Sequence, residues 1–149
     1  ITSFLIKESI PNAKLFAKEG FLTDKFFSTI ISHTTTNDSI LIVLNGNENY
    51  EWGHSINQYL NHVADRKQFN FYNVNTQLNN DFERNLDAEF TKIFSNKLVK
   101  DMNNDYPCIA VLPFSTNLDV KNKLDSNNIY QRNDFEYFTV YTKHHTSFE

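Results

Sequence analysis

The chain of 149 residues predicts one α/β domain, and two observations carry this prediction. Three short runs rich in apolar residues, at 40–44, 69–76 and 108–112, have the length and composition of strands. The segments between them place apolar residues every three or four positions, which is typical of amphipathic helices. A chain of this length can bury a core without disulfide bonds, and 14 Phe, 7 Tyr and one Trp supply bulky side chains for it.

The first half of the chain predicts two helices, a strand and a third helix. Pro11 opens and Gly20 closes a short helix. Thr23 has the character of an N-cap, and apolar residues at helical spacing follow it: Phe26, Phe27, Ile30 and Ile31. The continuous apolar run 40–44 is the clearest strand. A helix from about 52 to 66 then buries one face, formed by Ile56, Tyr59, Leu60, Val63 and Ala64.

The second half predicts a strand, a long helix, a strand, a polar segment and a last strand. The strand at 69–76 precedes a helix that starts in a capping-box-like Asn80-x-x-Glu83 and runs to Met102. The next strand, 108–112, lies between Pro107 and Pro113. Residues 115–134 are polar and Asn-rich with one short amphipathic hint, so no strand is expected there. Alternation over 137–142 predicts a final strand near an edge of the sheet.

Composition excludes several functional classes. A net charge of −4 without a basic stripe argues against nucleic acid as a partner. No apolar run approaches the length of a membrane span, so we expect no membrane contact by this chain.

The single cysteine, Cys108, permits no intrachain disulfide and no zinc cluster. His54 and His62 lie about 12 Å apart along a helix, too far to share a metal ion, so no metal is expected. The chain has no Gly-rich phosphate loop, and no cofactor is expected. The chain starts at Ile1, which fits a processed or excised piece and leaves its compartment open.

The order of these elements resembles the thioredoxin superfamily over roughly residues 20–112. The quoted stretches that carry the resemblance are "LTDKFFSTII" for the helix before the first core strand, "ILIVLN" for that strand, "FNFYNVN" for the next, and "DYPCIAVL" for the third. The resemblance implies a mixed sheet flanked by helices and a cis-proline at Pro107. It also implies one thioredoxin-like domain over 1–149, with 1–20 as an N-terminal extension and 115–134 as an insertion. A parallel flavodoxin-like or TIR-like sheet is the alternative.

The departures from that family concern its chemistry. The family's dithiol corresponds to positions 49–53 here, where no cysteine occurs. The buried acid of its redox-active members corresponds to Val43. The resemblance therefore indicates a redox-inactive member, similar in role to the non-catalytic domains of disulfide isomerases.

The predicted site lies where loops leave the carboxyl ends of the strands, which is where open α/β sheets bind ligands. In a thioredoxin-like arrangement the loop after the first strand would face the proline segment before the third. The expected binding residues are Asn45, Asn47, Tyr50, Glu51, Trp52, His54, Tyr106 and Pro107. Aromatic side chains beside an extended proline segment offer a platform for a protein or peptide. We therefore expect a protein-interaction module with no catalytic residue.

Two other functions use residues of the same region. Glu51 and His54 at the strand ends could serve a hydrolytic α/β enzyme acting on a nucleotide or small ligand, although solvated surface residues explain them as well. Cys108 could form a mixed disulfide with a partner if its pKa were lowered, but its place at the start of an apolar strand favours an inert buried thiol.

Overall fold

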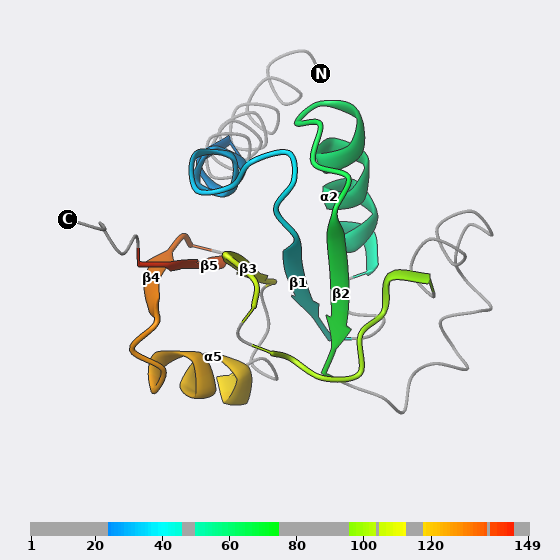
Figure 1. Ribbon diagram of the computed structural model, residues 1–149. Coiled ribbons are helices and arrows are strands. Elements are labelled where there is room, and N and C mark those ends of the chain that lie inside the picture. Colours follow the sequence, from blue (N-terminus) through cyan, green and yellow to red (C-terminus); the bar gives the residue numbers. More distant parts are fainter. Residues whose placement is uncertain are drawn as a thin grey trace, which may run out of the picture.

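The computed structural model describes residues 24–45, 50–74, 96–103, 105–112, 118–136 and 138–144 (Figure 1). The helices expected over 11–20 and over 80–95 lie outside these residues. The described elements after a helix at 24–32 are β1 (Ile40–Leu44), α2 (Tyr50–His62), β2 (Phe69–Asn73), β3 (Cys108–Val111), α5 (Leu118–Asp125), β4 (Tyr130–Asp134) and β5 (Thr139–Lys143).

The five strands form one mixed sheet in the order β2-β1-β3-β5-β4. β1 pairs in parallel with both β2 and β3, whereas β5 is antiparallel to β3 and to β4. The α/β class with a mixed sheet flanked by helices is confirmed. A purely parallel sheet, the alternative expectation, is ruled out by the two antiparallel pairings.

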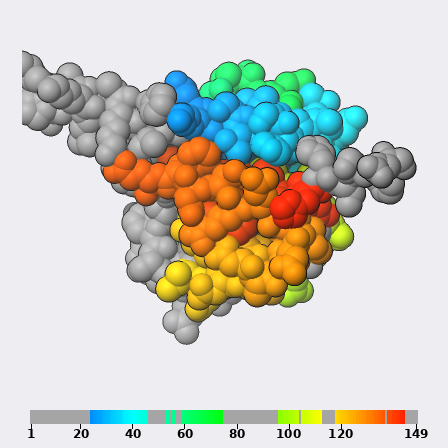
Figure 2. Space-filling model, turned by 90° about the vertical axis from the view of Figure 1, so that its left-hand side faces the viewer, coloured from blue at the N-terminus to red at the C-terminus, as the bar shows by residue number. Residues whose placement is uncertain are grey.

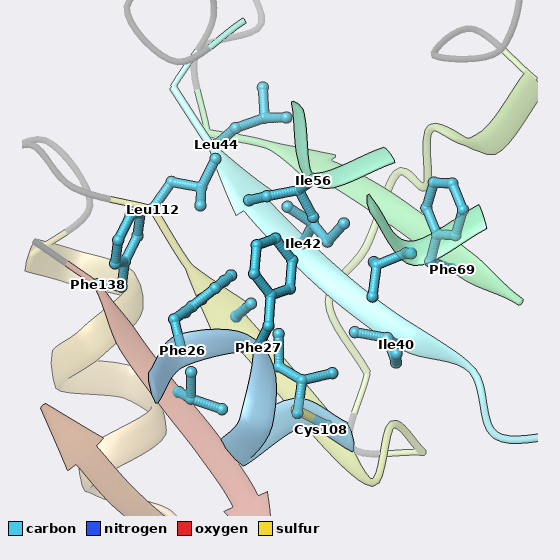
Figure 3. Packing of buried hydrophobic residues seen from close by; sticks show 14 of the residues in the cluster. Phe26, Phe27, Ile40, Ile42, Leu44, Ile56, Phe69, Cys108, Leu112 and Phe138 are labelled. Carbon is cyan, nitrogen blue, oxygen red and sulfur yellow. The ribbon is translucent and has the colours of Figure 1, made fainter. Parts of the chain in front are cut away.

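Helices cover both faces of the sheet, which explains why β1 and β3 are buried along their whole length. The helix 24–32 and α2 lie on one face, and α5 lies on the other (Figure 1). On the first face, side chains from the two helices interdigitate with alternate strand residues (Figure 3). The labelled members of this cluster are Phe26, Phe27, Ile40, Ile42, Leu44, Ile56, Phe69, Cys108, Leu112 and Phe138.

Aromatic contacts hold the helix 24–32 on this face. The ring of Phe26 lies 4.6 Å from that of Phe138, and Phe27 stacks on Tyr59 of α2 at 3.8 Å. Such pairs contribute about 0.5–1.5 kcal/mol each beyond the burial of their area. The predicted apolar face of this helix, including the fully buried Ile30, is therefore confirmed.

α2 ends earlier than the predicted residue 66. Its last helical residue is His62, and Asp65 adopts a left-handed φ of 49°. The N–H of Arg66 then donates to the carbonyl of Leu60 at 2.7 Å, which satisfies a carbonyl of the last turn. Val63, expected on the buried face, is consequently exposed beyond the helix end.

The C-terminal third departs most from expectation. Residues 118–134 supply both α5 and β4, where the sequence predicted a polar segment without a strand. Val120 and Leu124 of α5 are buried, while most of β4 is polar and exposed, so it lacks the alternation that marks a strand. The last strand, β5, lies between β3 and the edge strand β4, which agrees with the expectation of a strand near an edge. The region 98–102, expected to be helical, is also not helix: Leu98 forms a parallel bridge with Phe71.

Candidate functional site

The parallel strands β1, β2 and β3 all end at the same side of the sheet, which we call its carboxyl end. Pairing continues to the last residues, because Val74 donates its N–H to Leu44 at 2.9 Å and Leu112 donates to Val43 at 3.0 Å. Ladders that stay paired to their ends hold the backbone of this region in fixed register. The loops that follow therefore start from a rigid base.

A topological switch point lies between β1 and β3 at this carboxyl end. The chain leaves β1 through α2 on one face to reach β2, and then returns past β1 to β3. From β3 the chain continues to α5, which packs on the opposite face from α2. Crossovers that leave in opposite directions open a crevice above the strand ends, which is the place where open α/β sheets bind ligands.

Two buried amides mark the ends of β1 and β2. Asn45 follows β1 and is only 2% exposed, and Asn73 ends β2 in register with Leu44 at 6% exposed. A side-chain amide both donates and accepts hydrogen bonds, so the strand ends present polar groups within an apolar surrounding. Asn45 was among the predicted site residues. Asn73 was not, and its position as the last residue of an apolar strand is the signal that could have found it.

The other predicted residues of this loop lie around the start of α2. Tyr50, Glu51, Trp52 and His54 are placed by their backbone in the first turns of this helix. Asn47 lies outside the described residues. α2 begins only five residues after Asn45, so these positions stay at the carboxyl end of the sheet.

Tyr106 and Pro107 do not belong to this site, which corrects the prediction that they face the loop after β1. Cys108 is in register with Ile40, the first residue of β1. Because β1 and β3 run in parallel, Pro107 lies at the amino end of the sheet, about 20 Å along the strands from Asn45. No cis peptide bond occurs in the described residues, so the bond before Pro107 is trans and the expected cis-proline is wrong.

Tyr106 serves a hydrogen-bond network at the amino end of the sheet. Its hydroxyl accepts a hydrogen bond from Asn70 Nδ2 at 3.1 Å, and Asn70 Nδ2 also reaches Ser39 Oγ at 3.3 Å. The hydroxyl of Tyr130 donates to the carbonyl of Tyr106 at 3.0 Å. Burial, with the charge of Asp105 nearby, raises the pKa of Tyr130 to about 12. These contacts join β1, β2, β3 and β4, and they explain Tyr106 as a structural residue.

Cys108 is an inert thiol. It is fully buried in β3, and this burial raises its pKa to about 12. A nucleophilic cysteine needs an accessible thiolate. The Cys108 thiol is not accessible, and its raised pKa disfavours the thiolate. The structure therefore supports the prediction of a buried structural cysteine over that of a mixed disulfide.

Metal and membrane sites were also sought among the described residues. That part of the chain contains no group of three His, Cys, Asp or Glu side chains placed to hold a metal ion. Nor does it contain a helix with the length and apolar character needed to cross a bilayer.

Comparison with known proteins found no matching family model, no matching curated protein and no matching solved structure. The function is therefore inferred from the residues and geometry of this chain alone.

Proposed function

We propose that this chain is a non-catalytic binding domain that takes a protein or peptide at the carboxyl end of its sheet. The observation that carries the proposal is the switch point between β1 and β3, with α2 starting directly beside it. Tyr50 and Trp52 belong to the first turn of α2, and we assign them to this site. Aromatic residues are enriched among the side chains that dominate binding energy at interfaces.

The chemistry of the chain supports binding over redox exchange. The sequence has no second cysteine to form a dithiol, and Cys108 is buried with a raised pKa at the opposite end of the sheet. The proposal of a redox-inactive, thioredoxin-like domain keeps this missing dithiol and the mixed α/β sheet. Because the bond before Pro107 is trans and Pro107 lies at the other end of the sheet, the proposed binding surface is formed by the β1–α2 region alone.

A hydrolytic enzyme acting on a nucleotide or small ligand is the second candidate. The switch point favours it, because such crevices accept small ligands in many open α/β sheets. Glu51 and His54 would supply the acid and base, since both follow β1 on the first turns of α2.

The sole tryptophan of the chain, Trp52, provides a direct test of the proposed site. Its intrinsic fluorescence should change when peptides selected from a random display library bind, and the affinity should fall at least about tenfold in Tyr50→Ala and Trp52→Ala. The Tyr50 variant is followed by fluorescence and the Trp52 variant by calorimetry. Tyr106→Phe, an aromatic substitution at the amino end of the sheet, is the matched control and should bind like the parent.

Equal affinity in all four proteins would remove the site assignment. ATP, GTP and NAD titrated under the same conditions test the second candidate. Turnover of a nucleotide that stops in Glu51→Gln would establish the enzyme, and the binding proposal would then be wrong.

A further inference from the structure

The two outermost strands of the sheet differ in how their outer sides are covered. Beside β2, Leu98 forms a parallel bridge with Phe71, and Val99 donates its N–H to the carbonyl of Phe71 at 2.8 Å. Beside β4, the described residues include no further strand. Figure 2 shows the surface formed by β4 and α5, in orange and yellow, facing the viewer. Within the described part of the chain, the outer side of β4 therefore has backbone positions open for pairing.

The register with β5 identifies the backbone groups on that outer side. The N–H of Phe135 donates to Phe138 at 2.7 Å, and the N–H of His144 donates to Ile129 at 3.0 Å. Hydrogen-bonded pairs alternate along an antiparallel ladder, so the odd-numbered residues of β4 bond to β5. The N–H and C=O groups of Arg132 and Asp134 consequently point away from β5.

The side chains of the same two residues carry opposite charges on one face of the sheet. Arg132 donates Nε to Asp134 at 3.0 Å and Nη1 to Asp125 of α5 at 2.6 Å. Both side chains remain accessible, with Arg132 at 40% and Asp134 at 55% exposed. The guanidinium has five N–H donors, and these contacts use two of them. Arg132 can therefore donate hydrogen bonds to a further carboxylate.

We propose that β4 pairs with β4 of a second copy of this chain, antiparallel about a two-fold axis at Asn133. In this register Arg132 of each copy lies opposite Asp134 of the other, so the outward backbone groups form hydrogen-bonded pairs on both sides of the axis. Each arginine also faces an aspartate across the interface, the favourable arrangement for directly opposed charges. The two sheets become one continuous sheet.

The charge pattern identifies a second copy as the occupant. Charged residues on an outer strand normally prevent pairing with other strands. An arginine and an aspartate placed symmetrically about Asn133 are self-complementary under a two-fold axis, and they repel strands that lack this pattern. The interface is isologous and short, so it forms a dimer that assembles at high protein concentration.

A charge-exchange experiment tests the pairing. Arg132→Asp places aspartates opposite one another, and Asp134→Arg places arginines opposite one another, so each variant alone should self-associate at least about tenfold more weakly than the parent. An equimolar mixture of the two variants should associate again, because every arginine then faces an aspartate. Sedimentation velocity over a concentration series up to the millimolar range measures this. Lys123→Asp, a charge change on an exposed position of α5, is the control and should associate like the parent.

A crosslink tests the register independently of charge. Residues 133 of the two copies form a non-hydrogen-bonded pair with Cα atoms about 4.5 Å apart, within the range of a disulfide. Asn133→Cys should therefore form a covalent dimer under air oxidation, whereas Gln131→Cys should not, since its two copies lie about 14 Å apart. The native thiol, Cys108, is buried and does not compete. A parent that stays monomeric at millimolar concentration, or variants whose mixture associates no better than either alone, would overturn the proposal.

Discussion

Arg66 should be a major contributor to the stability of this domain. Its side chain joins the end of the helix 24–32 to the turn after α2 through four hydrogen bonds. Nε donates to Thr34 Oγ1 at 3.2 Å, and Nη2 donates to the carbonyls of Thr34 at 2.8 Å and Ile31 at 3.4 Å. Nη1 donates to the carbonyl of Ala64 at 3.0 Å. These carbonyls lie in the last turn of a helix or just after it, where no intrahelical donor reaches them and where a positive charge is favoured.

The size of the effect follows from these contacts. A hydrogen bond to a charged donor contributes about 1.5–3 kcal/mol, and bonds made by one side chain do not add. Thr34 is buried, at 7% exposed, so Arg66→Ala leaves its carbonyl and hydroxyl without this donor. We expect Arg66→Ala to lower the free energy of unfolding by about 3 kcal/mol. Arg66→Lys keeps the charge but loses the planar fork, and about half of the loss should remain.

Urea unfolding followed by far-UV circular dichroism measures this loss. With a slope of about 2 kcal/mol per M, the midpoint of Arg66→Ala should fall by about 1.5 M. Lys67→Ala is the matched control: its ion pair with Asp65 at 3.3 Å is exposed, at 74% and 70%, so the change should stay within about 0.5 kcal/mol. An Arg66→Ala midpoint equal to that of the parent, or an equal loss in the Lys67 variant, would refute the assigned role.

Two further predictions concern the buried thiol and a buried hydroxyl. Burial raises the pKa of Cys108 to about 12, above the ordinary value of 9.0 for a cysteine thiol, so stability should fall as pH rises between these two values. Cys108→Ala should flatten this part of the pH dependence, and an unchanged slope would contradict this explanation. Tyr130→Phe removes the hydrogen bond to the carbonyl of Tyr106 and should lower the free energy of unfolding by about 1 kcal/mol in the same urea assay. The control is Tyr72→Phe, because the hydroxyl of Tyr72 makes no hydrogen bond within the described residues. This control should lower the free energy of unfolding by less than about 0.5 kcal/mol.

The sequence correctly predicted the strands that form the centre of the sheet. The apolar runs at 40–44 and 108–112 became β1 and β3, because strands covered on both faces must be apolar at every position. The helical spacing of Phe26, Phe27 and Ile30 likewise predicted the buried face of the first described helix. A strand that is buried on both faces needs an unbroken apolar run, and such a run can be recognised in the sequence.

The sequence did not reveal elements whose burial is partial. β4 reads Tyr-Gln-Arg-Asn-Asp, and only Tyr130 of these is buried, so no alternation marks it as a strand. It forms because β5 supplies an antiparallel partner along its whole length. The same pairing makes β4 the edge strand and places β5 next to it, which agrees with the prediction of a strand near an edge.

The sequence by itself determined the α/β class, the missing dithiol and the concentration of aromatic and polar residues between β1 and α2. Only the tertiary structure decided which of these residues lie together. Local composition specifies that a segment is a strand but not the direction in which its neighbour runs. The parallel pairing of β1 with β3 sends Pro107 to the amino end of the sheet and leaves the candidate site, at the carboxyl end, to Asn45, Asn73 and the start of α2.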